Sequence, residues 1–190
     1  MVFQNRAWIK SGMVLMFGLL GCSGVPFEKY VSRDPMLGVS MSYPKGWQYR
    51  ESRGAYGSYA DVMFYPEAKD AREARAMMAL TVEKDPKLVS LDAAAKDLIA
   101  KRMKFKGAQV LAQANRNVLG ASAAVIDFSY QKPEDLLDVR SGLALFKERV
   151  VVFHANGMFA FFRYESKAED FDRYLPFFRR MVASLKSSRH

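Results

Sequence analysis

The chain has 190 residues, a length that fits one ordinary domain with a sizeable core. Its hydrophobic content of 50% excludes a largely disordered protein, and its single cysteine excludes an internal disulfide. The formal net charge of +9 favours partners with anionic surfaces.

Residues 1–22 have the parts of an export signal. Arg6 and Lys10 precede an apolar run at residues 13–20, which is too short to span a bilayer, and Gly21 then precedes Cys22. This order resembles a bacterial lipoprotein signal at residues 1–21. The resemblance implies cleavage before Cys22, a thioether-linked diacylglycerol on its sulfur, and acylation of the new amino terminus. The alternative is a cytosolic protein with an apolar N-terminal helix and a buried cysteine.

Export would set both the location and the partners of the chain. Removing residues 1–21 takes away Arg6 and Lys10 and no acidic residue, so the charge becomes +9 − 2 = +7. Such a charge favours lipid headgroups, acidic glycans or an acidic protein, and export argues against nucleic acid. Ser23, in place of an aspartate after the cysteine, indicates the outer membrane, facing the periplasm, in a cell with two membranes. We expect residues 22–36 to form the lipidated cysteine and a tether that ends near the Asp34-Pro35 turn.

The first part of the expected domain, residues 37–188, reads as strands followed by a helix. Alternation of apolar and polar residues predicts strands at residues 39–43, 47–52, 61–65 and 77–83. Ser90 is a good helix N-cap, and Asp92 is placed to favour the positive end of the helix. Apolar residues then recur at helical spacing, which predicts an amphipathic helix that ends by Gly107.

The second part reads as two hairpins and a final helix. Strands are expected at residues 108–118, 122–130, 143–153 and 158–165. Asn156-Gly157 predicts a type I′ hairpin turn, whose two central residues need positive φ. An apolar stripe between Phe171 and Leu185 predicts the last helix. Pro176 lies inside the stripe, so we expect a short turn up to Tyr174 and a helix that restarts with Pro176 in its first turn.

Segregated strands and helices predict an α+β fold with a mainly antiparallel sheet. The segment Val39–Trp47, VSMSYPKGW, resembles the strand–Tyr-Pro-x-Gly-Trp opening of PsbP-like proteins, a group that includes DcrB-like proteins. The strand at 61–64, the helix after Ser90, the hairpin at 156–157 and the helix end at 181–185 also fit that group. The resemblance covers residues 36–186 and implies a central sheet with helices on both faces, an α/β/α sandwich, and an accessory role. Cyanobacterial PsbP homologues are also lipoproteins, but no metal-binding motif of the family can be placed on these residues.

Three groups of residues are candidate sites. Residues 43–47 are either a ligand platform or, as their Pro and Gly favour, a structural turn with Trp47 at the edge of the core. His154 lacks metal-ligand spacing, because the other histidine is His190. Asp61 and Glu51 are a conceivable acid–base pair, although carboxylates are common on sheet surfaces. With no phosphate loop or nucleophile motif in the sequence, we expect no catalytic residue, metal or cofactor.

Basic residues lie beside the apolar stripe of the last helix. They are Arg173, Arg179, Arg180 and Lys186. They form either a solvated face or a contact surface for lipid headgroups or an acidic partner.

The leading function is therefore a non-enzymatic, membrane-anchored lipoprotein that serves as an accessory, assembly or scaffold factor for an envelope or membrane complex. The alternatives are a small-ligand or ion-binding module, an extrinsic photosystem II subunit of the PsbP type in a photosynthetic source, and an enzyme. A deep pocket with converging polar groups would favour a ligand module. A buried carboxylate with a strongly shifted pKa would favour an enzyme.

Overall fold

The computed structural model describes residues 24–66, 74–85, 87–134 and 142–188. Cys22 and the expected signal at residues 1–21 lie outside the described residues. The strands are β1 (Phe27–Val31), β2 (Val39–Pro44), β3 (Gln48–Arg53), β4 (Tyr59–Tyr65), β5 (Ala76–Glu83), β6 (Lys106–Val118), β7 (Ala121–Pro133), β8 (Leu143–Ala155), β9 (Met158–Lys167) and β10 (Lys186–Ser187). The α-helices are α1 (Leu91–Arg102) and α2 (Phe171–Ala183), and a single 3₁₀ turn, η1, spans Ala55–Gly57.

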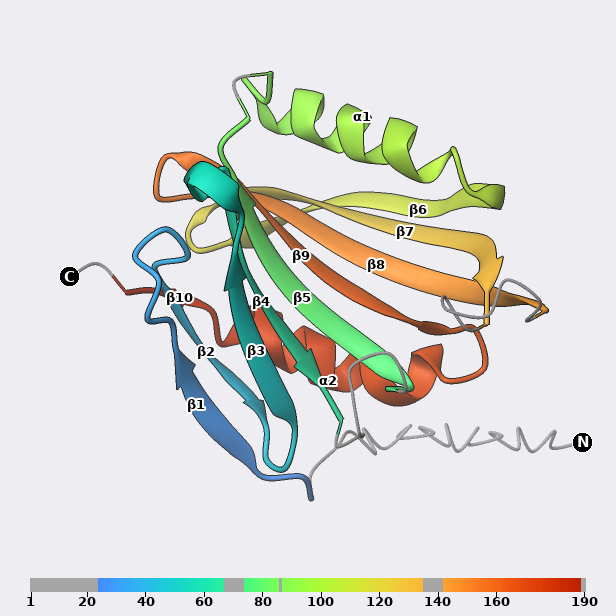
Figure 1. The fold of residues 1–190 in the computed structure, drawn as a ribbon, viewed down its shortest axis with the longest axis horizontal. Helices are drawn as coiled ribbons and strands as arrows, with labels where there is room; N and C mark the ends of the chain where they lie inside the picture. Colours follow the sequence, from blue (N-terminus) through green and yellow to red (C-terminus); the bar gives the residue numbers. More distant parts are fainter. Residues whose placement is uncertain (1–23, 67–73, 86, 135–141, 189–190) are drawn as a thin grey trace, which may run out of the picture.

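Seven of these strands form one antiparallel sheet in the order β3-β4-β5-β9-β8-β7-β6. A small antiparallel sheet has the order β1-β2-β10. Figure 1 shows α1 on one side of the large sheet, with α2 and the small sheet on the other. Two apolar clusters fill the spaces between these layers. The predicted α+β class, with a mainly antiparallel sheet and helices on both faces, is confirmed.

Helix α1 begins and packs as the sequence predicts. The Ser90 hydroxyl accepts a hydrogen bond of 3.1 Å from the Ala93 N–H, which satisfies one of the free donors at the helix start. The buried face of α1 presents Ala94, Ala95 and Leu98 to the sheet. These small side chains let the helix lie close to the sheet. Helix α1 packs on β7 and β8 and covers only this part of its side of the sheet.

Helix α2 is one continuous helix from Phe171 to Ala183, and our expectation of a break before Pro176 is wrong. Its buried residues follow the predicted stripe: Phe171, Tyr174, Leu175, Phe178 and Met181. Pro176 is the sixth residue of the helix, so only the carbonyl of Asp172, in the exposed first turn, loses its intrahelical partner. Packing of the stripe on the sheet outweighs that loss.

The strand β1 shortens the expected tether. Residues 27–31 pair antiparallel with β2, although we expected a tether through residue 36. Tyr30 is 1% exposed, and its ring lies edge-on to Phe64 of β4 at 5.2 Å between centroids. The buried ring of Tyr30 supplies the apolar contact that a solvated tether lacks. The domain therefore begins at Phe27, ahead of the expected boundary at residue 37.

The predicted hairpin at residues 156–157 is confirmed. Asn156 has a φ of 52° and Gly157 a φ of 79°, as a type I′ turn requires. The turn joins β8 to β9, which form the centre of the large sheet together with β5.

Candidate functional site

The predicted basic residues all lie exposed on the side of the molecule formed by α2 and the small sheet. Arg173 and Arg180 are seven residues apart, so they share one helix face about 10 Å from each other. The Arg180 guanidinium lies 3.9 Å from the centroid of the Phe27 ring, in cation–π contact. No acidic residue occurs between Arg173 and Ser188, so the charges of this stretch of the chain are all positive.

The small sheet extends this surface with residues that the sequence interpretation missed. Phe27, Lys29 and Val31 share the face of β1 that turns away from Tyr30, and Val31 is 44% exposed. Lys186 lies opposite Ser40, whose other neighbour is Val31. We call the set Phe27, Lys29, Val31, Arg173, Arg179, Arg180 and Lys186 the basic surface. Residues 27–31 do not alternate apolar and polar, so no local pattern revealed the β1 part.

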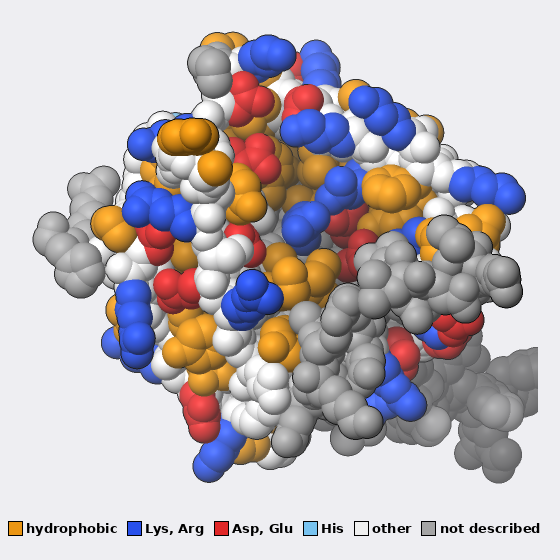
Figure 2. Space-filling view, viewed as in Figure 1, with side chains coloured by type: hydrophobic (Ala, Val, Ile, Leu, Met, Phe, Trp, Pro, Cys, Tyr) orange, Lys and Arg blue, Asp and Glu red, His pale blue; other side chains and the backbone are white. Residues whose placement is uncertain are grey.

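A groove lies on the opposite side of the large sheet, where α1 stops short of β3, β4 and β5. It encloses about 380 Å³ and is lined by Asp61, Thr81, Asp97, Lys101, Phe161 and Arg163, among others. Figure 2 shows this face hollowed below α1, with charged side chains of both signs around an apolar floor. The Nε atom of Arg163 is buried and has no hydrogen-bond partner among the described residues.

The end of α1 is tied to β8 by a buried ion pair, whose Arg102 also lines the groove. Arg102 donates from Nε to Glu148 Oε2 at 2.5 Å and from Nη2 to Oε1 at 2.8 Å. The side chain of Glu148 is only 1% exposed and that of Arg102 13%. Burial by itself lowers the pKa of Arg102, but the hydrogen bond and the charge of Glu148 raise it above its ordinary value. The Arg102 guanidinium therefore stays charged at physiological pH.

A second polar cluster lies beside this pair. The Tyr130 hydroxyl donates to Glu165, whose other oxygen accepts from the Lys132 ammonium. Burial, followed by the charges of Glu148 and Glu165, raises the pKa of Tyr130 far above its ordinary value. The phenol is therefore neutral and acts as a structural donor. Both Glu148 and Glu165 are held in ion pairs by basic side chains.

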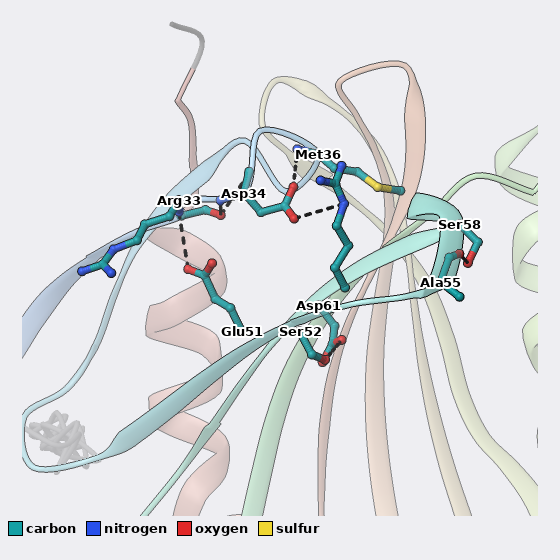
Figure 3. A network of polar contacts seen from close by, with 10 residues as sticks. Arg33, Asp34, Met36, Glu51, Ser52, Ala55, Ser58 and Asp61 are labelled. Carbon is teal, nitrogen blue, oxygen red and sulfur yellow. Dashed lines mark hydrogen bonds and ion pairs between the residues drawn. The ribbon is translucent and has the colours of Figure 1, made fainter.

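The conceivable acid–base pair is not brought together. Glu51 lies opposite Val62 and accepts a hydrogen bond of 2.6 Å from Tyr30, on the side of the small sheet. Asp61 lies opposite Ser52 and accepts a hydrogen bond of 2.5 Å from its hydroxyl, on the side of the groove. The two carboxylates belong to opposite faces of the sheet (Figure 3). The hypothesis of a shared site is wrong, because neighbouring positions on paired strands alternate between faces.

The other two candidates have structural surroundings. Trp47 is half-buried, and its ring lies 6.0 Å from those of Tyr174 and Phe177 on α2. His154 is exposed, lies edge-on to Phe159 and borders a wide recess of about 740 Å³. Within the described ranges, no group of three or more His, Cys, Asp or Glu residues is placed to hold a metal ion.

No known family profile matches the chain, and no curated protein does. Solved structures do match. The cyanobacterial PsbP protein (CyanoP) of Synechocystis has a TM-score of 0.57 at 17% identity, with 90% of this chain and 99% of that one covered. The Ran-binding protein Mog1p of Saccharomyces cerevisiae has a TM-score of 0.51 at 8% identity, covering 86% of this chain and 96% of that one. LpqN, involved in cell envelope biogenesis of Mycobacterium tuberculosis, has a TM-score of 0.48 at 13% identity, covering 86% of this chain and 91% of that one.

The likeness to CyanoP establishes the fold. The chain has a PsbP-like fold, as the segment Val39–Trp47 and the order of its elements predict. Neither helix of the described residues is long and apolar enough to cross a membrane.

Proposed function

We propose that this chain is a non-enzymatic lipoprotein, anchored to a membrane of the cell envelope through Cys22, that serves as an accessory or scaffold factor for a membrane protein complex. One observation carries the proposal: β1 begins five residues after Cys22, and β1 is part of the basic surface. The five residue steps from Cys22 to Phe27 span at most about 18 Å even when fully extended. A lipid on Cys22 therefore keeps the basic surface next to the headgroups.

The chemistry of the basic surface suits that position. Each exposed lysine or arginine close to an anionic leaflet contributes roughly 1 kcal/mol of attraction, within a Debye length of about 8 Å. Several acyl chains on Cys22 would already anchor the protein stably. Arg179 and Arg180, with Lys29 and Lys186, add a basic patch that orients the domain on the headgroups.

The polar groups of the groove favour a scaffold over an enzyme. Arg102 lines the groove and is paired with the buried Glu148. Glu165 is held by Lys132, and Tyr130 is kept neutral. Paired groups of this kind hold a fold together and are poorly placed to exchange protons with a substrate. The likeness to CyanoP concerns the fold alone, so a photosystem role is confined to a photosynthetic source.

A small-ligand module is the second candidate, and Arg163 is the observation that favours it. Its buried, unpartnered Nε lines a groove large enough for a small anionic molecule. Native mass spectrometry of the protein purified from its own membranes distinguishes the two functions. A bound small molecule that is lost in Arg163→Gln would favour the ligand module, and its absence would favour the scaffold.

The anchor is tested directly by labelling cells with radioactive palmitate. We expect the parent chain to carry label, Cys22→Ala to carry none and stay unprocessed, and Ser23→Ala to be labelled like the parent. Normal labelling of Cys22→Ala would show that the acyl group is elsewhere and would overturn the proposed anchor. In a cell with two membranes, fractionation should find the labelled parent in the outer membrane.

A further inference from the structure

The strand β6 has a neighbour on one side only among the described strands. It is 13 residues long, and it pairs with β7 along its inner edge. In an antiparallel ladder every second residue directs its N–H and C=O away from the partner, so the outer edge of β6 presents a row of free donors and acceptors. Such an edge is a template for another strand unless something blocks it.

The other edge of the same sheet is blocked. Strand β3 has only six residues and carries Arg50, Glu51 and Arg53. The segment before β2 lies against it: Glu51 accepts from the Arg33 N–H at 3.4 Å, and Asp34 pairs with Arg53 at 3.5 Å. Figure 3 shows these contacts. Short length, charge and a covering loop are the usual protections of an edge strand.

The part of β6 from Gly107 to Asn115 has none of these three protections. No charged residue and no proline occur from Gly107 to Asn115. The two irregularities of the β6–β7 ladder are confined to residues 106–112, and pairing is regular from Ala112 to Val118. Every side chain from Gln109 to Asn117 is exposed, so neither helix covers this part of the strand. The edge is open along residues 112–117, and Arg116 is the one charge on it.

Charge indicates which kind of strand fits the open edge. From Leu98 to Ile126 the chain has no aspartate or glutamate, while Lys104, Lys106 and Arg116 lie at the two ends of β6. A second copy of the chain would bring these cations together, and each full chain already carries +9. Opposite charges across paired strands are favourable and like charges are not. We propose that β6 docks an extended, acidic segment of a partner protein, which adds an eighth strand to the sheet.

This docking edge deepens the proposed accessory role, since it names the surface that engages the protein complex. Strand β6 lies six strand spacings, or about 29 Å, from β3, which packs near the small sheet. The molecule can therefore face headgroups with the basic surface and hold a partner strand at the opposite edge. The docking edge is tested without lipid, so its failure and the failure of the anchor are distinguishable.

The experiment follows backbone amides by NMR in a soluble form that starts at Ser23 and contains all the described strands and helices. The probe is a blocked seven-residue peptide that alternates valine with threonine and has glutamate at both ends. At millimolar concentration it should slow hydrogen exchange at alternate amides of residues 112–118. A matched peptide with lysine at both ends should bind about ten-fold more weakly, which corresponds to about 1.4 kcal/mol.

Charge exchange supplies the matched control. Arg116→Glu should weaken binding of the glutamate peptide and strengthen binding of the lysine peptide. Arg50→Glu, on the protected β3 edge, should leave the affinity for both peptides unchanged. Equal binding of the two peptides, slowed exchange at β3, or no binding would overturn the proposal. A dimer in sedimentation, with β6 amides that exchange slowly even without peptide, would also overturn the proposal. The strand that occupies the edge would then come from a second copy of the chain.

Discussion

At the residue scale, the ion pair of Arg102 with Glu148 fastens the end of α1 to β8. Removing one partner of a buried pair leaves an uncompensated charge, which typically costs about 3–5 kcal/mol. We expect Arg102→Met to lower the free energy of unfolding by that amount in urea denaturation. The double variant with Glu148→Leu should recover most of the loss. If the single variant loses less than about 1 kcal/mol, water reaches Glu148 and the pair is not buried in solution.

Tyr130 gives the fold a dependence on alkaline pH. Its pKa in the folded state is raised above the ordinary value of 10.0, first by burial, so the unfolded chain loses this proton before the folded one does. The associated stability is present below about pH 10 and is lost as the pH rises above that value, by up to about 1.4 kcal/mol per pH unit. Urea unfolding between about pH 8 and pH 11 should show a shallower decline for Tyr130→Phe than for the parent. Equal slopes for the two proteins would mean that the Tyr130 phenol ionises as readily in the folded state as in the unfolded chain.

At the element scale, Trp47 joins the turn after β2 to helix α2. Truncating a fully buried tryptophan costs about 3–5 kcal/mol, and the half-buried ring of Trp47 should lose less. We expect Trp47→Ala to lower the free energy of unfolding by about 2 kcal/mol, and Lys45→Ala, at an exposed position of the same turn, by less than about 0.5 kcal/mol. A loss below about 1 kcal/mol for Trp47→Ala would show that the ring makes no useful contact with α2 and would reopen the ligand-platform interpretation.

The elements that could be predicted from sequence are those whose signals are local. Alternation gave the strands of the large sheet, Ser90 marked the start of α1, and Asn156-Gly157 marked the central hairpin. Strand β1 was missed because five residues beside a turn and a proline carry a weak local signal, and its stability comes from burial of Tyr30 by distant residues. The continuity of α2 through Pro176 has the same origin in tertiary packing.

The site was predictable to a smaller degree. The arginines of α2 are exposed as their spacing beside the apolar stripe predicts, because helical periodicity separates the two faces. The groove and its ion pairs were not predictable, since Arg102 and Glu148 are 46 residues apart and meet only when α1 crosses the sheet. Sequence spacing alone does not show such a meeting.

At the scale of the whole molecule, positive charge is divided between two sides. The basic surface lies on α2 and the small sheet, while Lys87 and Lys104 lie at the two ends of α1 on the opposite side of the large sheet. If only the overall charge attracted the protein to a membrane, Lys87 and Lys104 would contribute as much to binding as Arg179 and Arg180. If the anchor presents one particular side, only the basic surface should matter.

Vesicle binding tests whether the basic surface faces the membrane. The soluble form that starts at Ser23 is mixed with vesicles of anionic phosphatidylglycerol, with neutral phosphatidylcholine as reference. We predict weak binding at low salt that is lost near physiological salt, and binding to anionic vesicles alone.

Arg179→Glu with Arg180→Glu should lower the affinity about ten-fold or more. Loss of the Arg180 contact with Phe27 should lower stability by only about 0.5–1 kcal/mol. Lys87→Glu with Lys104→Glu makes the same change in net charge and should leave the affinity within about two-fold, well under 1 kcal/mol. Equal weakening by the two double variants, or no weakening by the arginine pair, would contradict a membrane-facing basic surface.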